Sequence, residues 1–280
     1  MKIIETALQV LNDEIDGINL LKKFFDSNFE DAVKTIFDSN GKVVVSGVGK
    51  SGHVGRKISA TLSSTGTPSF FIHPTEASHG DMGMIEKNDV ILAISWSGET
   101  TELGDIVRFA HENKNKLIGL SSNKNSHLAK SSDIALNLPN AKEACPNGLA
   151  PTTSTTMQLI VGDALAISLL NIRDFDKDNF RSLHPGGSLG AILAKVSDIM
   201  HIDDEIPVLN KGSKMSEAII KISEKGFGCI GIILEEKLLI SPMPGCTYGA
   251  RCIPLQWREQ HMLTLFRLAS MYNNARVNKS

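Results

Sequence analysis

Two glycine- and hydroxyl-rich loops, each preceded by a short apolar run, constrain the fold more than any other feature of this chain. The first run, residues 42–46, leads into Gly47-Val-Gly-Lys-Ser-Gly52; the second, residues 89–95, leads into Trp96-Ser-Gly-Glu-Thr-Thr-Glu102. Runs that are apolar throughout are typical of strands buried on both faces of a parallel sheet. Small residues between a strand and a helix leave backbone N–H groups free to bind an anion. The loops therefore predict a site for a phosphorylated small molecule.

The sequence around these loops alternates helical and strand patterns. We expect helices over residues 3–38 (two of them), 51–64, 100–112 and 154–170. We expect further strands at 69–72, 117–121 and 134–138. This order predicts an α/β fold with a parallel sheet in a three-layer αβα arrangement, with ligands bound at the carboxyl ends of the strands.

The pattern changes near Asp198, where a second module is expected, with a helix over 214–225 and a strand over 229–234. Both tyrosines and one of the two tryptophans lie in the last 40 residues, which show no usable period. That shift suggests either a tail or a changed reading frame near residue 240. The predicted segments are N-terminal helices (1–38), a sheet domain (39–196), a partial second module (197–240) and an aberrant tail (241–280).

Composition excludes several classes of function. The net charge is −2, and no basic run exceeds Lys22-Lys23, so a nucleic-acid partner is not expected. The four cysteines form no CxxC pairs, which argues against a zinc ribbon or a disulfide framework. No apolar run approaches the roughly 18 residues of a membrane span, and acids interrupt the start of the chain. We expect a cytoplasmic protein without a membrane partner.

Two nucleotide-binding motifs match only in part. Gly47-x-Gly49-x-x-Gly52 fits the dinucleotide fingerprint, but the acid expected at the end of the next strand is replaced by Ile72-His73-Pro74. A P-loop would need a glycine where Val44 stands. Nicotinamide binding is therefore disfavoured, and the P-loop interpretation fails.

Several ionisable side chains stand close to the loops or in irregular segments. Lys50 is either a solvated loop lysine or a cation that reaches a phosphate or sugar oxygen. Of Glu99 and Glu102, in a first helical turn, we expect one to face the pocket. Glu143 lies in an irregular stretch, where a plain loop acid is equally expected. The histidines in Pro/Gly-rich surroundings, which favour acid–base or metal roles, are His73, His79 and His184.

Six motifs, in order over residues 1–235, resemble the sugar isomerase (SIS) family and, within it, the D-arabinose 5-phosphate isomerases. They occupy residues 47–53, 64–71, 73–81, 142–146, 149–156 and 184–187. The resemblance implies an aldose–ketose isomerase that interconverts D-ribulose 5-phosphate and D-arabinose 5-phosphate through an enediol. Its product would supply the Kdo precursor of lipopolysaccharide or capsule. It also implies a homotetramer with shared active sites and no required cofactor, with zinc at His73 incidental or inhibitory.

The resemblance also carries over site residues. The catalytic group is Lys50, Glu102, Glu143 and His184, and the sugar-phosphate site includes Gly66, Thr67, His73 and His79. To these the loop pattern adds phosphate contacts from Gly49, Ser51, Ser95, Ser97 and Thr100.

The chemistry of isomerisation suggests a role for each catalytic group. We expect Glu143 to be the base, with a pKa raised by burial, although Glu102 could exchange roles with it. Lys50 would stabilise the enediolate, and His184 would come from a neighbouring subunit.

Two departures from the family leave alternatives open. Trp96 stands where the family usually has asparagine, which would weaken activity if the indole faced the ligand and change little if it faced the sheet. The family continues with two CBS modules, whereas only a partial CBS module fits here. An inactive remnant is therefore one alternative function. A non-catalytic sugar-phosphate sensor of the same fold is the other, although residues 1–38 are too acidic and too short for the DNA-binding helix-turn-helix that usually precedes such a domain.

Overall fold

The computed structural model describes residues 2–184, 196–234 and 237–242. The chain forms two compact units, Met1–Leu193 and Ala194–Ser280, and each is described by itself. The first unit contains a five-stranded, fully parallel sheet in the order β2-β1-β3-β4-β5. Its strands are β1 (Val43–Gly47), β2 (Ser69–Ile72), β3 (Val90–Ile94), β4 (Lys116–Ser121) and β5 (Ile134–Asn137).

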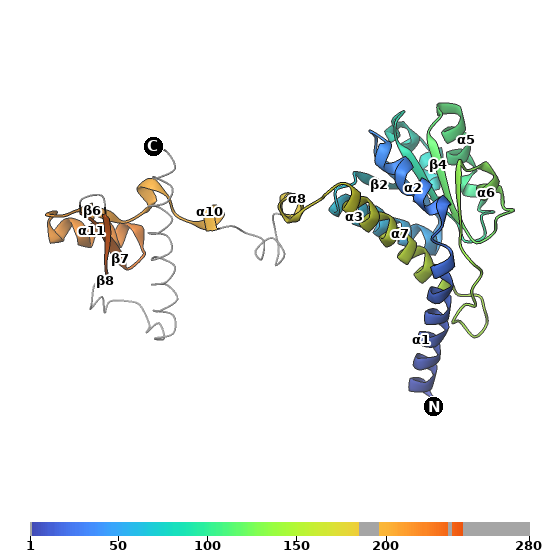
Figure 1. Cartoon of the computed structure of the whole chain (residues 1–280), viewed down its shortest axis with the longest axis horizontal. Coiled ribbons are helices and arrows are strands. Elements are labelled where there is room, and N and C mark those ends of the chain that lie inside the picture. The colour runs from blue at the N-terminus through green and yellow to red at the C-terminus, as the bar shows by residue number, and fades with distance from the viewer. Residues whose placement is uncertain (1, 185–195, 235–236, 243–280) are drawn as a thin grey trace. The chain divides into compact units, whose positions relative to one another are not determined.

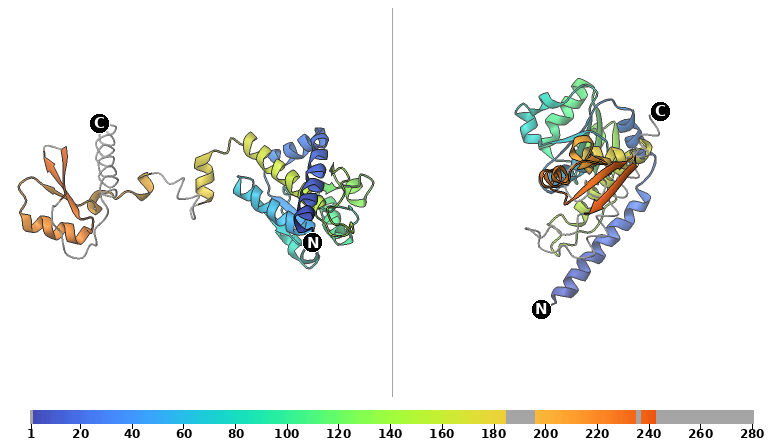
Figure 2. Two further views of the ribbon diagram at one scale, coloured as in Figure 1. Left: turned by 90° about the horizontal axis from the view of Figure 1, so that it is seen from below. Right: turned by 90° about the vertical axis from the view of Figure 1, so that its left-hand side faces the viewer.

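Helices cover both faces of this sheet, as Figures 1 and 2 show. One face carries α2 (Ser27–Asp38), α3 (Gly49–Ser64) and α7 (Thr153–Ile172), with α1 (Ile3–Leu20) packed on α7. The other face carries α4 (Pro74–Ser78), α5 (Gly104–Asn113) and α6 (His127–Ser131). The predicted three-layer α/β architecture is confirmed.

Alternate residues of each strand fill two separate cores, because successive strand side chains point to opposite faces. Val43 and Val45 pack with the α3 and α7 side chains, whereas Val44 packs with those of α4 and α5. All three valines are at most 1% exposed, which accounts for a strand that is apolar at every position.

Helix α7 is long and apolar enough to cross a membrane by length and composition. In this fold it is a core helix. Met157, Val161 and Leu165 are fully buried on it, and the helix packs against α1, α2 and α3. These contacts account for its hydropathy within the sheet domain.

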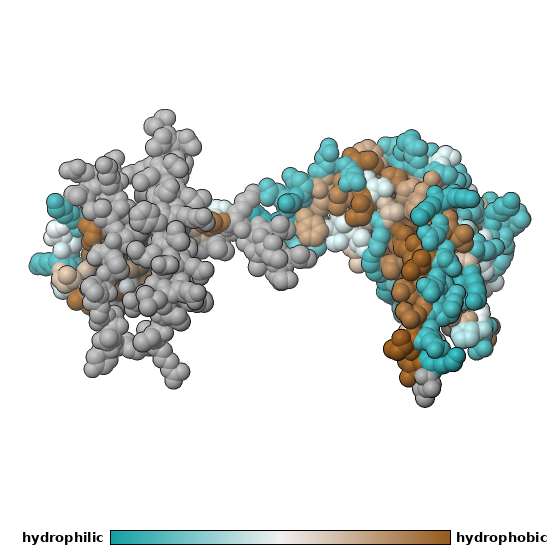
Figure 3. Space-filling model, turned by 60° about the horizontal axis from the view of Figure 1, so that its bottom comes forward, coloured by the Kyte–Doolittle hydropathy of each residue, from teal (hydrophilic) through white to brown (hydrophobic). Residues whose placement is uncertain are grey.

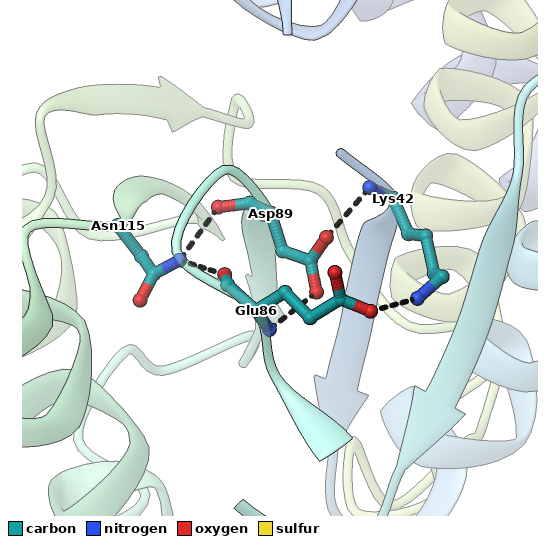
Figure 4. A network of polar contacts seen from close by, with 4 residues as sticks. All are labelled: Lys42, Glu86, Asp89 and Asn115. Atoms are coloured by element: carbon teal, nitrogen blue, oxygen red, sulfur yellow. Dashed lines mark hydrogen bonds and ion pairs between the residues drawn. The ribbon is translucent and has the colours of Figure 1, made fainter. Parts of the chain in front are cut away.

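A network of polar contacts joins the amino ends of β1, β3 and β4 (Figure 4). The carboxylate of Asp89, which is 2% exposed, accepts hydrogen bonds from the backbone N–H of Lys42 (2.7 Å) and of Glu86 (2.8 Å). The side-chain amide of Asn115 donates to the carbonyls of Glu86 and Asp89. The Lys42 ammonium pairs with the Glu86 carboxylate at 2.6 Å. The polar groups at the amino ends of these strands therefore bind one another.

Helix α1 projects from the rest of its unit and carries an apolar stripe, brown in Figure 3. Ile4, Leu8, Leu11 and Ile15 recur at helical spacing and are 43–73% exposed. A contiguous exposed apolar stripe is typical of an interaction surface.

The second unit has the β-α-β-β order. Strand β6 (Val208–Asn210) pairs in parallel with β7 (Cys229–Leu234), which pairs antiparallel with β8 (Lys237–Pro242). Helix α11 (Met215–Lys225) connects β6 to β7 and buries Ile222, and a short helix, α10 (Val196–Ile199), precedes them. The proposed partial CBS module and the tail remain predictions, and residues 243–280 lie outside the described residues.

The predicted helices and strands are found at nearly the predicted positions, but the structure also contains elements that were not predicted. The helix expected over 100–112 is a 3-10 turn (Thr101–Leu103) followed by α5. The short helices α4 and α6, the helix α8 (Lys177–Leu183) and the strands β6 and β8 were not predicted.

Candidate active site

A cavity of about 390 Å³ lies at the carboxyl edge of the sheet, between the loops that follow β1 and β3. The strand order reverses direction between these two strands, and such a switch point is where doubly wound sheets bind their ligands. The described residues that line it are Val48, Lys50, Ser51, Ile94, Ser95, Trp96, Ser97, Thr100, Glu143, Gly148, Leu149, Pro151, Ser154 and Thr155.

The loop after β1 turns sharply into α3. Gly49 has φ +59°, a left-handed conformation that glycine adopts without strain. At Gly52 a Cβ would lie 2.5 Å from the carbonyl oxygen of Gly47, so glycine lets the helix start directly on the strand end. The first N–H groups of α3 have no acceptor within the helix and are free for an anion. The Lys50 side chain lines the cavity and makes no ion pair with any described residue.

The loop after β3 is held largely by its own hydroxyls. The Ser95 hydroxyl, 3% exposed, accepts from the Gly98 N–H and shares a 2.7 Å hydrogen bond with the Thr100 hydroxyl. The Ser97 hydroxyl accepts from the Glu99 N–H at 3.2 Å. Ser95 therefore builds the turn, and Ser51, Ser97 and Thr100 are better placed to contact a ligand from the cavity wall.

Glu143 reaches the cavity from an irregular segment and caps α7. Its Oε2 atom accepts hydrogen bonds from the Thr152 N–H (2.6 Å), the Thr152 hydroxyl (2.9 Å) and the Ser154 N–H (3.3 Å). Burial raises the pKa of the Glu143 carboxyl, but the hydrogen bonds from Ser154 and Thr152 outweigh burial and hold the pKa below its ordinary value. The expected rise towards neutrality is therefore wrong, because a half-buried carboxylate at a helix N-terminus gains more from donors than it loses in solvation.

Glu102 lines a neighbouring cavity of about 420 Å³, together with Arg108 and His127. Within one chain it is therefore separated from Lys50 and Glu143. Glu99 faces neither cavity, since its carboxylate accepts from the His127 N–H at the start of α6. Within one chain, neither of the two acids lines the cavity with Lys50, so the expectation that one of them faces that pocket stays a prediction.

His73 and His79 flank α4 at the carboxyl end of β2. His73 Nδ1 accepts from the Thr75 N–H at 3.3 Å and caps the helix, and His79 follows its last turn. Neither lines the cavity with Lys50. Across the described residues, no three His, Cys, Asp or Glu side chains gather in a way that could hold a metal ion.

Gly66 and Thr67 lie at the amino ends of the strands and do not line the cavity with Lys50 within one chain, so their assignment to the sugar-phosphate site stays a prediction. They precede β2, where the carbonyl of Pro68 accepts from the N–H of Val43 at the start of β1. Thr67 is 2% exposed, and a Cβ on Gly66 would collide with the Phe175 ring. Glycine is required there by close packing and by its φ of +90°.

His184 follows α8, stacks on Phe180 with ring centroids 4.0 Å apart, and contacts the Phe180 carbonyl through Nδ1. It does not line the cavity within one chain. The remainder of its motif, residues 185–187, lies outside the described residues.

Sequence reasoning missed the groups that bind Glu143. Thr152 and Ser154 stand out only as part of a hydroxyl-rich helix start, which predicts a cap but not what it caps. It also missed the role of Cys145: hydrogen bonds from the Ala150 and Leu149 N–H groups lower the pKa of its thiol and shape the loop that brings Gly148 and Leu149 to the cavity.

Comparison with known proteins agrees with this geometry. An SIS domain matches residues 35–168. Arabinose 5-phosphate isomerase KdsD of Yersinia pestis is 47% identical over 237 residues, which are 84% of this chain and 72% of that protein. The Pseudomonas aeruginosa enzyme of the same name is 44% identical over the same shares.

A solved Escherichia coli CFT073 protein in complex with arabinose 5-phosphate is 40% identical, with a TM-score of 0.64 over 66% of this chain and 98% of that chain. The resemblance found from the motifs is thereby confirmed. This chain belongs to the SIS-domain family of arabinose 5-phosphate isomerases.

Proposed function

We propose that this chain is an aldose–ketose isomerase that interconverts D-ribulose 5-phosphate and D-arabinose 5-phosphate. The observation that carries the proposal is the single cavity shared by a cation without an ion pair among the described residues, Lys50, and a carboxylate, Glu143, beside a helix N-terminus. Two relatives named for this activity are 47% and 44% identical to this chain.

The phosphate is held at the start of α3, where the N–H groups of Gly49 and Ser51 and the hydroxyls of Ser97 and Thr100 can donate. A phosphate there places the sugar chain along the cavity towards Glu143. Isomerisation then requires one proton to move between C1 and C2 and another to move between their oxygens.

Glu143 is the base that removes the proton from C1 of the ketose. Its Oε2 atom accepts hydrogen bonds from Thr152 and Ser154, and the residue lines the cavity beside Lys50. Its lowered pKa keeps the carboxylate ionised at neutral pH. The electron pair of the broken C–H bond forms the enediolate, and returning the proton at C2 gives the aldose. Glu102 remains the alternative base, if a neighbouring copy brings it to the substrate.

Lys50 stabilises the negative charge that develops on the enediolate oxygen, since its ammonium is not neutralised by an ion pair with a described residue. His184 passes the proton between the two oxygens. It is supplied by a neighbouring subunit, because within one chain it lies outside the cavity. No metal is needed for these steps, and zinc bound at His73 would be inhibitory.

The assembly is a homotetramer with shared sites. The exposed stripe of α1, with Leu8 and Leu11 each more than half exposed, supports burial against another copy. The product serves Kdo synthesis for lipopolysaccharide or capsule, and the enzyme works in the cytoplasm, where phosphorylated sugars are retained by their charge.

A coupled assay with D-ribulose 5-phosphate tests the proposal directly. We expect saturable formation of D-arabinose 5-phosphate, and no turnover by purified protein that binds the sugar would instead favour the sensor or remnant functions. Co-expressed Glu143→Gln and His184→Asn chains should recover activity that neither variant has alone. Failure to recover it would place both groups in one subunit.

A further inference from the structure

Trp96 is fixed in the crevice by its backbone. It follows Ser95 at the end of β3, and its carbonyl accepts two hydrogen bonds of 2.8 Å from the N–H and the hydroxyl of Ser122, at the end of β4. Two bonds from one residue of a neighbouring strand hold the backbone at this position. The indole therefore starts from a fixed point beside the cavity.

The ring has two environments. It packs against the core cluster on the α3 and α7 face of the sheet, and it lines the cavity that contains Lys50 and Glu143. The sequence left open whether the indole faces the ligand or the sheet; in the structure, part of the ring contacts the core and the residue also lines the cavity. Packing against the core limits the rotamers of the indole, so the part that reaches the cavity is a rigid wall.

The other walls cannot do the same work. Of the described residues that line this cavity, Trp96 is the one aromatic; the apolar ones besides it are the smaller Val48, Ile94, Leu149 and Pro151. A sugar presents hydroxyls at its rim but C–H groups on its faces, and an aromatic ring packs well against such a face. A large fixed ring also limits the length of chain that fits between the phosphate site and the base.

We propose that Trp96 is a specificity-determining residue, whose indole packs on the C–H face of the pentose chain and excludes a chain one carbon longer. This inference rests on the proposed isomerase function and assigns it a substrate size. The family asparagine at this position would give a polar, smaller wall.

The kinetic test compares Trp96→Asn and Trp96→Phe with the unmodified chain, using D-ribulose 5-phosphate and D-fructose 6-phosphate. We expect Trp96→Asn to raise KM for the pentulose phosphate about tenfold, with a smaller change in kcat, and to reduce the preference for it over the hexulose phosphate about tenfold. Trp96→Phe should keep most of that preference. Equal preference in the unmodified chain and Trp96→Asn, with both proteins folded, would overturn the inference while leaving the isomerase function standing.

A binding test separates this inference from the activity. In a Trp257→Phe background, Trp96 is the single tryptophan of the chain, so its fluorescence reports the cavity. Titration with D-arabinose 5-phosphate should change the emission saturably, also in Glu143→Gln, which does not turn over. Saturable binding seen by calorimetry without any change in emission would show that the ring does not meet the sugar.

Discussion

Lysine and glutamate side chains lie at both the amino ends and the carboxyl ends of the strands of the parallel sheet, but they have different roles at the two ends. At the amino edge, the Lys42 ammonium and the Glu86 carboxylate lie 2.6 Å apart, and Asp89 is saturated by backbone donors. At the carboxyl ends of the strands, neither Lys50 nor Glu143 has an ion pair with a described residue, and both line the cavity. Pairing, rather than residue type, separates structural from chemical groups in this fold.

The electrostatic consequence follows from the partners. The hydrogen bond from the Lys42 ammonium to the Glu86 carboxylate raises the pKa of Lys42 and lowers the pKa of Glu86, so each group stabilises the charge of the other. Because their charges already neutralise each other, Lys42 and Glu86 attract a charged ligand only weakly. An unmatched ammonium beside a helix N-terminus attracts an anion instead.

Removal of the carboxylate at the carboxyl edge should have the largest effect. Glu143→Gln should lower kcat by about 10²–10⁴-fold, because the amide cannot accept the substrate proton. D-arabinose 5-phosphate should still raise the melting temperature of this variant. Glu86→Gln is the matched control at the amino edge and should stay within about twofold of the unmodified activity, since its ion pair is exposed. Near-normal kcat in Glu143→Gln would remove Glu143 from the role of base.

Lys50→Met should lower kcat/KM by about 10²–10³-fold, because the enediolate then forms without its counter-charge. The same substitution at the other edge, Lys42→Met, should have almost no kinetic effect. Steady-state assays of both variants measure the contrast. Similar losses in the two would mean that Lys50 acts on folding rather than on the substrate.

Asp89→Ala should reverse the pattern, with a large effect on stability and a small one on catalysis. It leaves the N–H groups of Lys42 and Glu86 without their acceptor, at a cost of about 2–3 kcal/mol in unfolding free energy. Urea denaturation measures the loss. A specific activity that fell in proportion to stability at temperatures where the variant is folded would contradict the separation of the edges.

The pH dependence of the unfolding free energy should reveal how much the Glu143 carboxylate stabilises the start of α7. The pKa of Glu143 is lowered in the folded chain, so its contribution is present above the ordinary value of 4.5 and is lost as pH falls through the folded-state value. Glu143→Gln should therefore be less stable than the unmodified chain by about 1 kcal/mol at pH 7, with the difference shrinking below pH 4.5. Unfolding curves at pH 7 and pH 3.5 test this, and a constant difference would mean that the carboxylate charge is not what caps α7.

Chelation should have the smallest effect. Turnover should be unchanged by EDTA, since the proposed steps use Lys50 and Glu143 without a metal. Loss of activity on chelation, restored by a divalent cation, would require a metal in the mechanism.

The five strands of the parallel sheet, the loops after β1 and β3 and the long core helix could all be predicted from local patterns. Apolar runs and glycines are recognised from a few neighbouring residues, and they correctly predict that Lys50 and the loop hydroxyls lie at the carboxyl ends of the strands. The placement of Gly66 and Thr67 could not be predicted in this way, because their motif matches the family but the start of β2 lies a strand length from the cavity. The pKa direction of Glu143 depends on Thr152 and Ser154, which are nine and eleven positions away. Short helices such as α4 lack a full period and gave no signal.

Because Glu143 both caps α7 and lines the cavity, few other residues can replace it during evolution. Its Oε2 secures the first turn of a helix of 20 residues, and the same residue lines the cavity. A substitution that retuned the acidity of this group would also loosen that long core helix. Selection on catalysis and selection on the lifetime of the folded chain therefore act on one position together, and few replacements can satisfy both.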